Sequence, residues 1–127
     1  MPLVRISFMT GKPAGFGKRV ADLVYQTMVD TINVPPKDNF QVITEHDKAS
    51  LIYDPDYLTI PRTDGVVFIQ ITLNEGRSVE LKKAFYRTLA ERLNQGLGVR
   101  MEDVLINLVE VKKENWSFGN GIAQYAG

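Results

Sequence analysis

The chain contains an internal repeat, because its second half aligns with its first half without a gap when it is shifted by 65 positions. In this register Gly11 meets Gly76, and a basic residue follows each glycine. Other equivalent positions hold residues of the same kind, namely Val4 and Ile69, Val24 and Leu89, Val34 and Val99, Asp38 and Asp103, and Glu45 and Glu110. So many matches in one register indicate two copies of one supersecondary unit. The fold must therefore be one that this unit can form with a second copy of itself.

Each copy has the pattern of a strand, a glycine turn, a helix, a short loop and a second strand. Apolar residues alternate with polar ones over 3–9, which predicts a strand, and recur every four residues over 14–32, which predicts a helix. The run Val34-Pro35-Pro36 ends that helix, and a second strand is predicted at about 40–45. The later copy predicts a strand at 66–73, a helix at 78–95 and a strand at 104–111.

The helix of the second copy also has recognisable ends: Ser78 suits its N-cap, and Gly96 and Gly98 suit its C-terminus. Each copy is then a βαβ unit with parallel strands and a right-handed crossover. Two such units predict an α/β fold, a four-stranded sheet with both helices on one face. We expect a single domain over 1–127, with copies at about 2–46 and 66–111.

Two further segments and one sheet face complete the prediction. The apolar connection at 47–65 is expected to pack onto the domain, and the aromatic, glycine-rich tail after Val111 to form a tight turn or hairpin that could reach a neighbouring subunit. The sheet face without helices would carry a half-apolar set, comprising Leu3, Arg5, Ser7, Phe68, Gln70 and Thr72. Because such a face needs a cover, we expect a homo-oligomer.

Composition excludes several classes of function. Fifteen basic residues balance fifteen acidic ones, which argues against nucleic acid or an anionic membrane as a partner. The absence of cysteine rules out a disulfide framework, a thiol nucleophile and a thiolate metal site, and the lone His46 is interpreted as a solvated turn residue. No apolar run approaches the roughly 20 residues of a membrane span, and no signal-peptide pattern opens the chain, so a cytoplasmic protein is expected.

The residue after the initiator methionine is a proline, and Met1 is normally removed before so small a residue. Pro2 would then be a free cyclic secondary amine that leads directly into the first strand. An α-amino group has a pKa near ~8 in water, and burial in an apolar pocket lowers that pKa. Such an amine can act as a general base or acid. The alternative is that Pro2 is an ordinary second residue.

These features together resemble the tautomerase superfamily, whose fold is that of macrophage migration inhibitory factor. The resemblance covers the whole chain and is strongest to the malonate semialdehyde decarboxylase branch. It depends on Pro2 and on three segments, Val34-Pro35-Pro36-Lys37-Asp38, Gly76-Arg77-Ser78 and Asn115-Trp116-Ser117-Phe118-Gly119. It implies a homotrimer with active sites near the subunit interfaces and with neither a metal nor an organic cofactor.

The resemblance also implies roles for individual residues. Pro2 takes the place of the catalytic amine, Asp38 that of an acid near the proline, and Arg77 that of an arginine that binds the substrate carboxylate. The aromatic residues Trp116, Phe118 and Tyr125 take the place of the pocket lining, although Tyr125 stands where a Phe is usual.

Structural alternatives exist for these residues. Asp38 could cap a turn as its equivalent Asp103 would, Arg77 could be a surface residue at a helix start, and Trp116 and Phe118 could be interface anchors. A cation at a helix start is disfavoured by the helix dipole, which favours a functional role for Arg77. Lys12, the equivalent of Arg77, is a weaker candidate for a substrate contact.

The sequence favours one reaction among three possibilities. The decarboxylase branch carries a second arginine two residues before the first, and here that position is Glu75. We therefore expect keto–enol tautomerisation of a small 2-oxo carboxylate, with Pro2 moving the proton, Arg77 binding the carboxylate and the aromatic residues excluding water. A decarboxylase or hydratase is the alternative enzyme, and a non-catalytic trimer that binds a small acid or a partner is the alternative outside catalysis.

Overall fold

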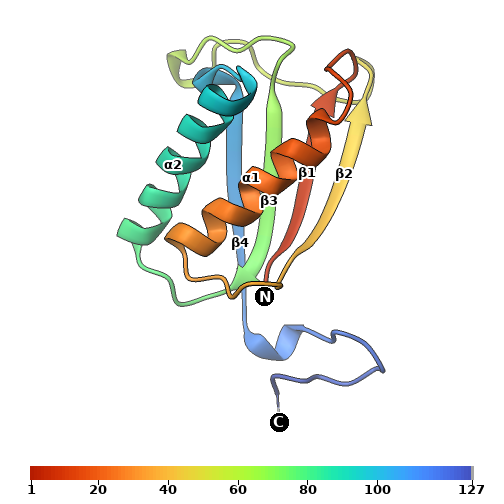
Figure 1. The fold of residues 1–127 in the computed structure, drawn as a ribbon, viewed down its shortest axis with the longest axis vertical. Coiled ribbons are helices and arrows are strands. Elements are labelled where there is room, and N and C mark those ends of the chain that lie inside the picture. Colours follow the sequence, from red (N-terminus) through yellow and green to blue (C-terminus); the bar gives the residue numbers. More distant parts are fainter. Residues whose placement is uncertain (127) are drawn as a thin grey trace.

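The structure, a computed structural model, describes residues 1–126. Its elements in chain order are β1 (Leu3–Met9), α1 (Phe16–Thr31), β2 (Phe40–His46), β3 (Val67–Asn74), α2 (Val79–Leu97) and β4 (Val104–Val111), with 3₁₀ turns at Tyr57–Thr59, Met101–Asp103 and Lys113–Asn115. The predicted strands and helices are all present, with ends displaced by one or two residues in places. The α/β prediction of two βαβ units is therefore confirmed (Figure 1).

The sheet has the strand order β2-β1-β3-β4. Strands are parallel within each copy, whereas the central pair of β1 and β3 is antiparallel. In that pair Leu3 lies beside Thr72 and Phe8 beside Val67. The two copies consequently run in opposite directions, so that the strands of the first copy begin where the strands of the second copy end.

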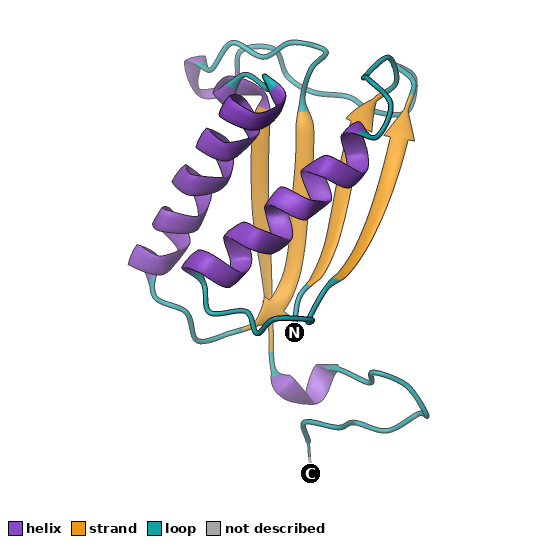
Figure 2. Ribbon diagram, viewed as in Figure 1, coloured by secondary structure: helices purple, strands orange, loops and turns teal. Residues whose placement is uncertain are grey.

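Both helices cover the same face of the sheet, as predicted (Figure 2). The core between them consists of the alternate strand residues and the inner helix faces, including Val4, Ile6, Ile69, Ile71, Val24, Met28, Phe85 and Leu89, all fully buried. The Ser78 hydroxyl accepts a hydrogen bond from the Leu81 N–H at 3.2 Å and caps α2. Gly98 ends that helix in a left-handed conformation (φ 69°), whereas Gly96 lies within its last turn.

The opposite sheet face has no helix over it. At one end the connection covers it, because Leu51 packs with Met9 and Val66 against Tyr53 and Phe68. Other apolar side chains on this face and in the connection are exposed, namely Phe40, Val42, Leu105, Val109, Ile52, Tyr57 and Leu58. The connection thus packs onto the domain only in part, and much of the face remains apolar and uncovered.

The tail after β4 extends beyond the sheet and turns back (Figure 1). The turn is closed by a hydrogen bond from the Ile122 N–H to the Gly119 carbonyl and by the Gln124 side chain, which bonds the main chain of Phe118 and Gly119. Residues 112–126 contain no β-strand, so the reversal is a loop and the predicted hairpin has no paired strands. Within the described residues, no helix is long and apolar enough to cross a membrane.

Candidate active site

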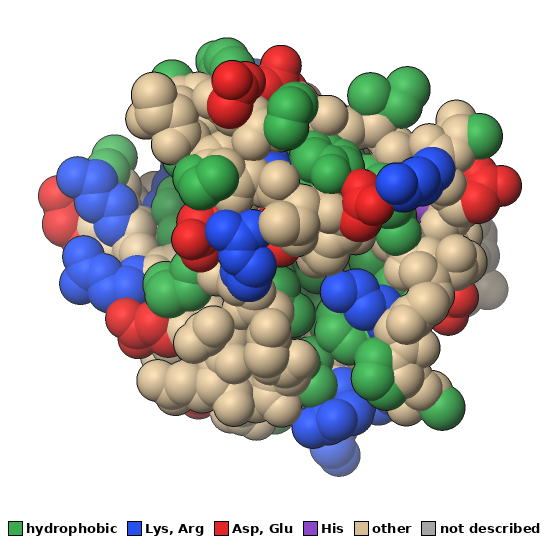
Figure 3. All heavy atoms as spheres, turned by 90° about the horizontal axis from the view of Figure 1, so that it is seen from above, with side chains coloured by type: hydrophobic (Ala, Val, Ile, Leu, Met, Phe, Trp, Pro, Cys, Tyr) green, Lys and Arg blue, Asp and Glu red, His purple; other side chains and the backbone are tan. Residues whose placement is uncertain are grey.

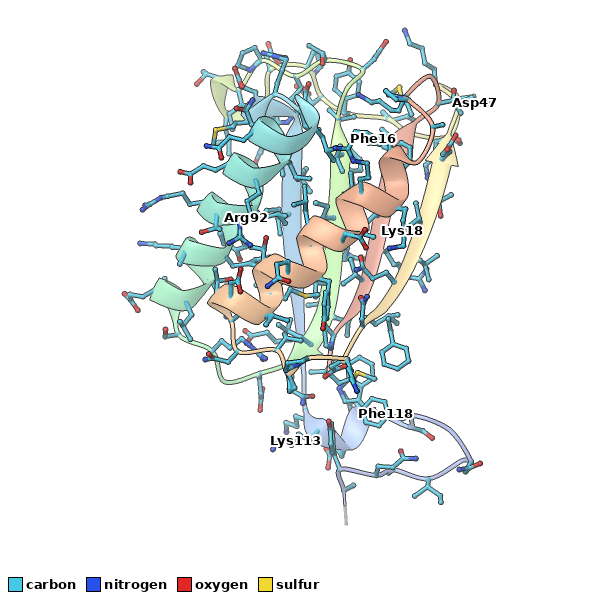
Figure 4. The ribbon with its side chains drawn as sticks, viewed as in Figure 1. Phe16, Lys18, Asp47, Arg92, Lys113 and Phe118 are labelled. Carbon is cyan, nitrogen blue, oxygen red and sulfur yellow. The ribbon has the colours of Figure 1, made fainter. Side chains whose placement is uncertain are left out.

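The antiparallel join of the two copies gathers the predicted site residues at one end of the sheet. Pro2 and Asp38 precede β1 and β2, while Arg77 and Trp116 follow β3 and β4. Figure 4 shows Phe118 below this end of the sheet, with Phe16 and Asp47 at the opposite end. Residues that are far apart in sequence therefore meet because the second copy is inverted relative to the first.

Pro2 is buried and directly precedes β1. The amine of the preceding Met1 lies 3.5 Å from Oδ2 of Asp38, so the start of the chain and this carboxylate are in contact. The other carboxylate oxygen, Oδ1, is buried and has no hydrogen-bond partner within the described residues. An unpaired buried carboxylate oxygen is costly, and such groups concentrate at functional sites.

Arg77 is partly buried between the two copies and is held by main-chain carbonyls. Its Nε donates to the carbonyl of Ile32 at 2.6 Å, and its Nη1 donates to the carbonyl of Asn74 at 3.2 Å. Ile32 is the C-cap of α1, where the negative end of the helix dipole favours a cation. The C-terminus of α1 therefore offsets, at the guanidinium, the unfavourable dipole of α2 that the sequence predicts for Arg77.

The charge of Arg77 is surrounded by acidic groups. Burial lowers the pKa of its guanidinium, and the carboxylates of Glu110 and Asp38 oppose that effect. Glu110 itself accepts a hydrogen bond from Lys82 Nζ at 2.8 Å, which is the main cause of its lowered pKa. Two hydrogen bonds fix the arginine, and its remaining N–H groups, which have no hydrogen-bond partner within residues 1–126, are of the kind that bind an anion bidentately.

The three predicted aromatic residues of the tail form one cluster, called here the aromatic cluster. Trp116 and Phe118 are stacked with ring centroids 5.5 Å apart, and Phe118 meets Tyr125 edge to face at 5.0 Å. The Trp116 Nε1 donates to Oδ1 of Asn74 at 2.8 Å, which attaches the cluster to the end of β3. Tyr125 remains 47% exposed, so the cluster is open on its outer side.

A cavity of about 450 Å³ lies beside the aromatic cluster. It is lined by Asn74, Glu75, Val111, Lys112, Lys113, Glu114, Tyr125 and Ala126. Of the six predicted site residues only Tyr125 lines it, and the other five lie at the same end of the sheet outside its wall. Glu75, which replaces the second arginine, shares the wall with two lysines, so cationic side chains are present there after all.

Asn74 is not among the residues predicted from the sequence, yet it contacts both Arg77 and Trp116. Its position at the strand end immediately before the Glu75-Gly76-Arg77 turn was the available signal. Lys12, in contrast, lies at the opposite end of the sheet, where its Nζ is 5.2 Å from the Phe16 ring. Figure 3 views that end, where acidic and basic side chains are interspersed.

A four-stranded sheet of two inverted βαβ copies, with both helices on one face, matches the fold of tautomerases. The chain matches the tautomerase enzyme family model over residues 38–119. It is 44% identical over 124 residues to the probable tautomerase YusQ of Bacillus subtilis (strain 168), and the aligned region covers 98% of each chain. The chain therefore belongs to the tautomerase family.

Solved structures agree and define the branch. FG41 malonate semialdehyde decarboxylase, in a structure inhibited by 3-bromopropiolate, is 32% identical, with a TM-score of 0.89 over 98% of this chain and 94% of that one. A second malonate semialdehyde decarboxylase is 29% identical, with a TM-score of 0.88 over 98% and 95% of the two chains. The protein is thus a member of the tautomerase superfamily in the branch that resembles malonate semialdehyde decarboxylase.

Proposed function

We propose that this tautomerase-family enzyme interconverts the enol and keto forms of a small 2-oxo carboxylate, with the amine of Pro2 as the proton carrier. The observation that carries the proposal is the meeting of the chain start, Asp38 and Arg77 at one end of the sheet. In the enol-to-keto direction the amine accepts the proton of the enol oxygen, and a proton is delivered to carbon 3. The carbonyl forms as the carbon–carbon double bond shifts, so that atoms and charge balance.

Arg77 binds the substrate carboxylate in this proposal. The hydrogen bonds to Ile32 and Asn74 hold the guanidinium before the ligand arrives, which spares the reorganisation that a mobile side chain would require. The same cation stabilises the enolate charge that develops next to the carboxylate. Asp38 would orient and stabilise the protonated amine that forms during transfer, because its carboxylate lies 3.5 Å from the amine of Met1, the residue bonded to Pro2.

We also propose that the uncovered sheet face is the interface of a homotrimer. Phe40 is 51% exposed and Leu105 is 40% exposed on a face that has no helix. Solved structures of the same fold include a fused 4-OT symmetric trimer that is 23% identical, with a TM-score of 0.79 over 98% of both chains.

A second candidate, decarboxylation of a 3-oxo acid, is favoured by the 32% identity to malonate semialdehyde decarboxylase. In that reaction the bond to the carboxylate carbon breaks, carbon dioxide leaves, and a proton is added to the resulting enolate. Lys112 and Lys113 in the cavity wall would supply the cation that Glu75 does not. Release of carbon dioxide from malonate semialdehyde distinguishes this reaction from tautomerisation.

The decisive experiment is the ketonisation of phenylenolpyruvate, followed by ultraviolet absorbance, with protein that intact mass shows to begin at Pro2. We expect a rate well above buffer that falls at least about 100-fold in Pro2→Ala. Pro13→Ala, which changes an exposed proline at the opposite end, should retain the rate. Equal rates for the wild type and Pro2→Ala would reject proline-dependent tautomerisation.

A further inference from the structure

We propose that Asn74 is a positioning residue that sets the distance between Arg77 and the aromatic cluster, and thereby the affinity for the substrate. The proposal deepens the function proposed above and rests on it. Asn74 is the last residue of β3 and makes two separate hydrogen bonds toward the site. Its main-chain carbonyl accepts from Arg77 Nη1 at 3.2 Å, and its side-chain Oδ1 accepts from Trp116 Nε1 at 2.8 Å.

The orientation of the Asn74 amide follows from its partner. An indole N–H can only donate, so the atom that faces Trp116 must be the amide oxygen. The amide nitrogen then points away from the indole, and Asn74 is also one of the residues that line the 450 Å³ cavity. One residue therefore contacts Arg77, which would bind the carboxylate, and Trp116 of the aromatic cluster, and it adjoins the cavity.

The position of Asn74 is itself rigid. It pairs with Val111 at the end of the β3–β4 ladder, and the next residue, Glu75, donates its N–H to the Val111 carbonyl at 2.9 Å. The tail beyond Val111 has no strand to hold it. The bond to Trp116 therefore joins a segment without β-strands to the sheet, and the stacked Phe118 and the edge-on Tyr125 follow the position of that ring.

A consequence for recognition follows from this geometry. The Asn74 side chain would determine the distance between a carboxylate bound by Arg77 and the rings of the aromatic cluster. Substrates whose apolar part fits that distance gain the contact with the aromatic cluster, and others do not. Because the contact exists in the bound substrate as well as in the transition state, its loss should raise KM and leave kcat nearly unchanged.

Asn74→Leu tests the proposal, because leucine has a similar size and cannot accept the indole N–H. Trp116 is the only tryptophan in the chain, so its emission reports directly on this contact. We expect the emission of Asn74→Leu to shift to longer wavelength and KM for phenylenolpyruvate to rise about tenfold, with kcat within twofold of wild type. Asn74→Asp keeps an acceptor at the same place and should restore the wild-type emission.

Two further variants separate positioning from a general effect on the fold. Asn94→Leu removes an asparagine that donates to the Val99 carbonyl at 3.0 Å near the end of α2, and it should alter neither emission nor KM. Trp116→Phe removes the N–H and keeps an aromatic ring, without changing the strand. In that background Asn74→Leu should raise KM no further, because the two changes remove the same bond.

The outcomes also separate this proposal from the proposed function. Unchanged emission and KM in Asn74→Leu would overturn the positioning role, as would additive effects of Asn74→Leu and Trp116→Phe. Should the wild type fail to turn over phenylenolpyruvate, 3-phenylpropionate, a carboxylate with an apolar ring, is titrated instead and its effect on the Trp116 emission is followed. A tenfold weaker 3-phenylpropionate affinity in Asn74→Leu would then uphold the positioning role while the reaction is rejected, and equal affinities would overturn it.

Discussion

Asp38 and Asp103 occupy equivalent positions in the two copies, yet only Asp103 has a complete set of hydrogen bonds. Asp103 is 2% exposed and accepts from the Thr63 N–H at 2.7 Å and from the Thr63 hydroxyl at 2.6 Å. Asp38 has an unpartnered buried Oδ1, and its Oδ2 faces the chain start. One copy thus uses the carboxylate to hold a loop, whereas the other leaves it available at the candidate site.

Alanine substitutions of these two acids should therefore affect different properties: stability in the case of Asp103 and activity in the case of Asp38. Asp103→Ala removes a buried carboxylate and leaves the N–H and hydroxyl of Thr63 without their acceptor, and it should lower the free energy of unfolding by about 1–3 kcal/mol, measured by urea denaturation. Asp38→Ala should change stability by only about 0.5 kcal/mol and reduce kcat/KM at least about 100-fold. If both variants lost mainly stability, Asp38 would be a structural residue like its equivalent.

Arg77 and Lys12 provide a second matched pair. Arg77→Ala should reduce kcat/KM by about 100- to 1,000-fold, largely through KM, because the carboxylate loses its bidentate partner. Arg77→Lys should restore little, since an ammonium cannot both donate to the Ile32 carbonyl and bind the carboxylate as a fork. Lys12→Ala, at the opposite end of the sheet, serves as the control. Comparable losses in Lys12→Ala and Arg77→Ala would contradict the assignment.

The fold was predictable from the sequence because the repeat and the periodicities act together. Alternation over β1 and four-residue spacing over α1 each specify one element, and the matching register of the second copy repeats the result. What the pattern does not contain is the relative direction of the two copies. That direction depends on the antiparallel pairing of Leu3 with Thr72, which is a long-range contact with no local signal.

The candidate site was predictable in part for the same reason. Residue types and the family resemblance identified Pro2, Asp38 and Arg77, which the structure brings to one end. The partners of these residues were not predictable, because Arg77 is bound by the main-chain carbonyl of Ile32, and any residue could supply that group. The role of Asn74 was not predictable, because its hydrogen bond to Trp116 forms only when the tail folds back onto the end of β3. The tail has no hydrophobic periodicity from which that fold could be predicted.

A third prediction is that activity depends on whether Pro2 is the first residue of the chain. With Met1 present, its amine faces Asp38 and the nitrogen of Pro2 is an amide without basicity. Protein carrying a cleavable extension before Pro2 should therefore be inactive in the phenylenolpyruvate assay, and cleavage that exposes Pro2 should restore the rate. Circular dichroism and size-exclusion chromatography should be unchanged by the extension. Full activity before cleavage would exclude the amine as the proton carrier.

The pH dependence of stability provides a fourth prediction, through Glu110 and Lys82. The hydrogen bond from Lys82 Nζ at 2.8 Å lowers the pKa of Glu110 below its ordinary value of 4.5. A carboxyl group whose pKa is lowered in the folded state binds protons more weakly there than in the unfolded state. The stability it contributes is therefore present above pH 4.5 and is lost as the pH falls through the lowered folded-state pKa.

Lys82→Met removes the partner that lowers this pKa. Wild type should be the more stable protein in urea denaturation at neutral pH, and the difference should narrow as the pH falls below 4.5 and vanish once Glu110 is protonated in both states. Lys83→Met, which changes the adjacent exposed lysine of α2, should show no such narrowing in the same range. The free energies of unfolding of wild type and Lys82→Met could instead differ by the same amount below pH 3. In that case the methylene groups of Lys82, and not its charge, would stabilise the fold, because hydrophobic contacts do not titrate.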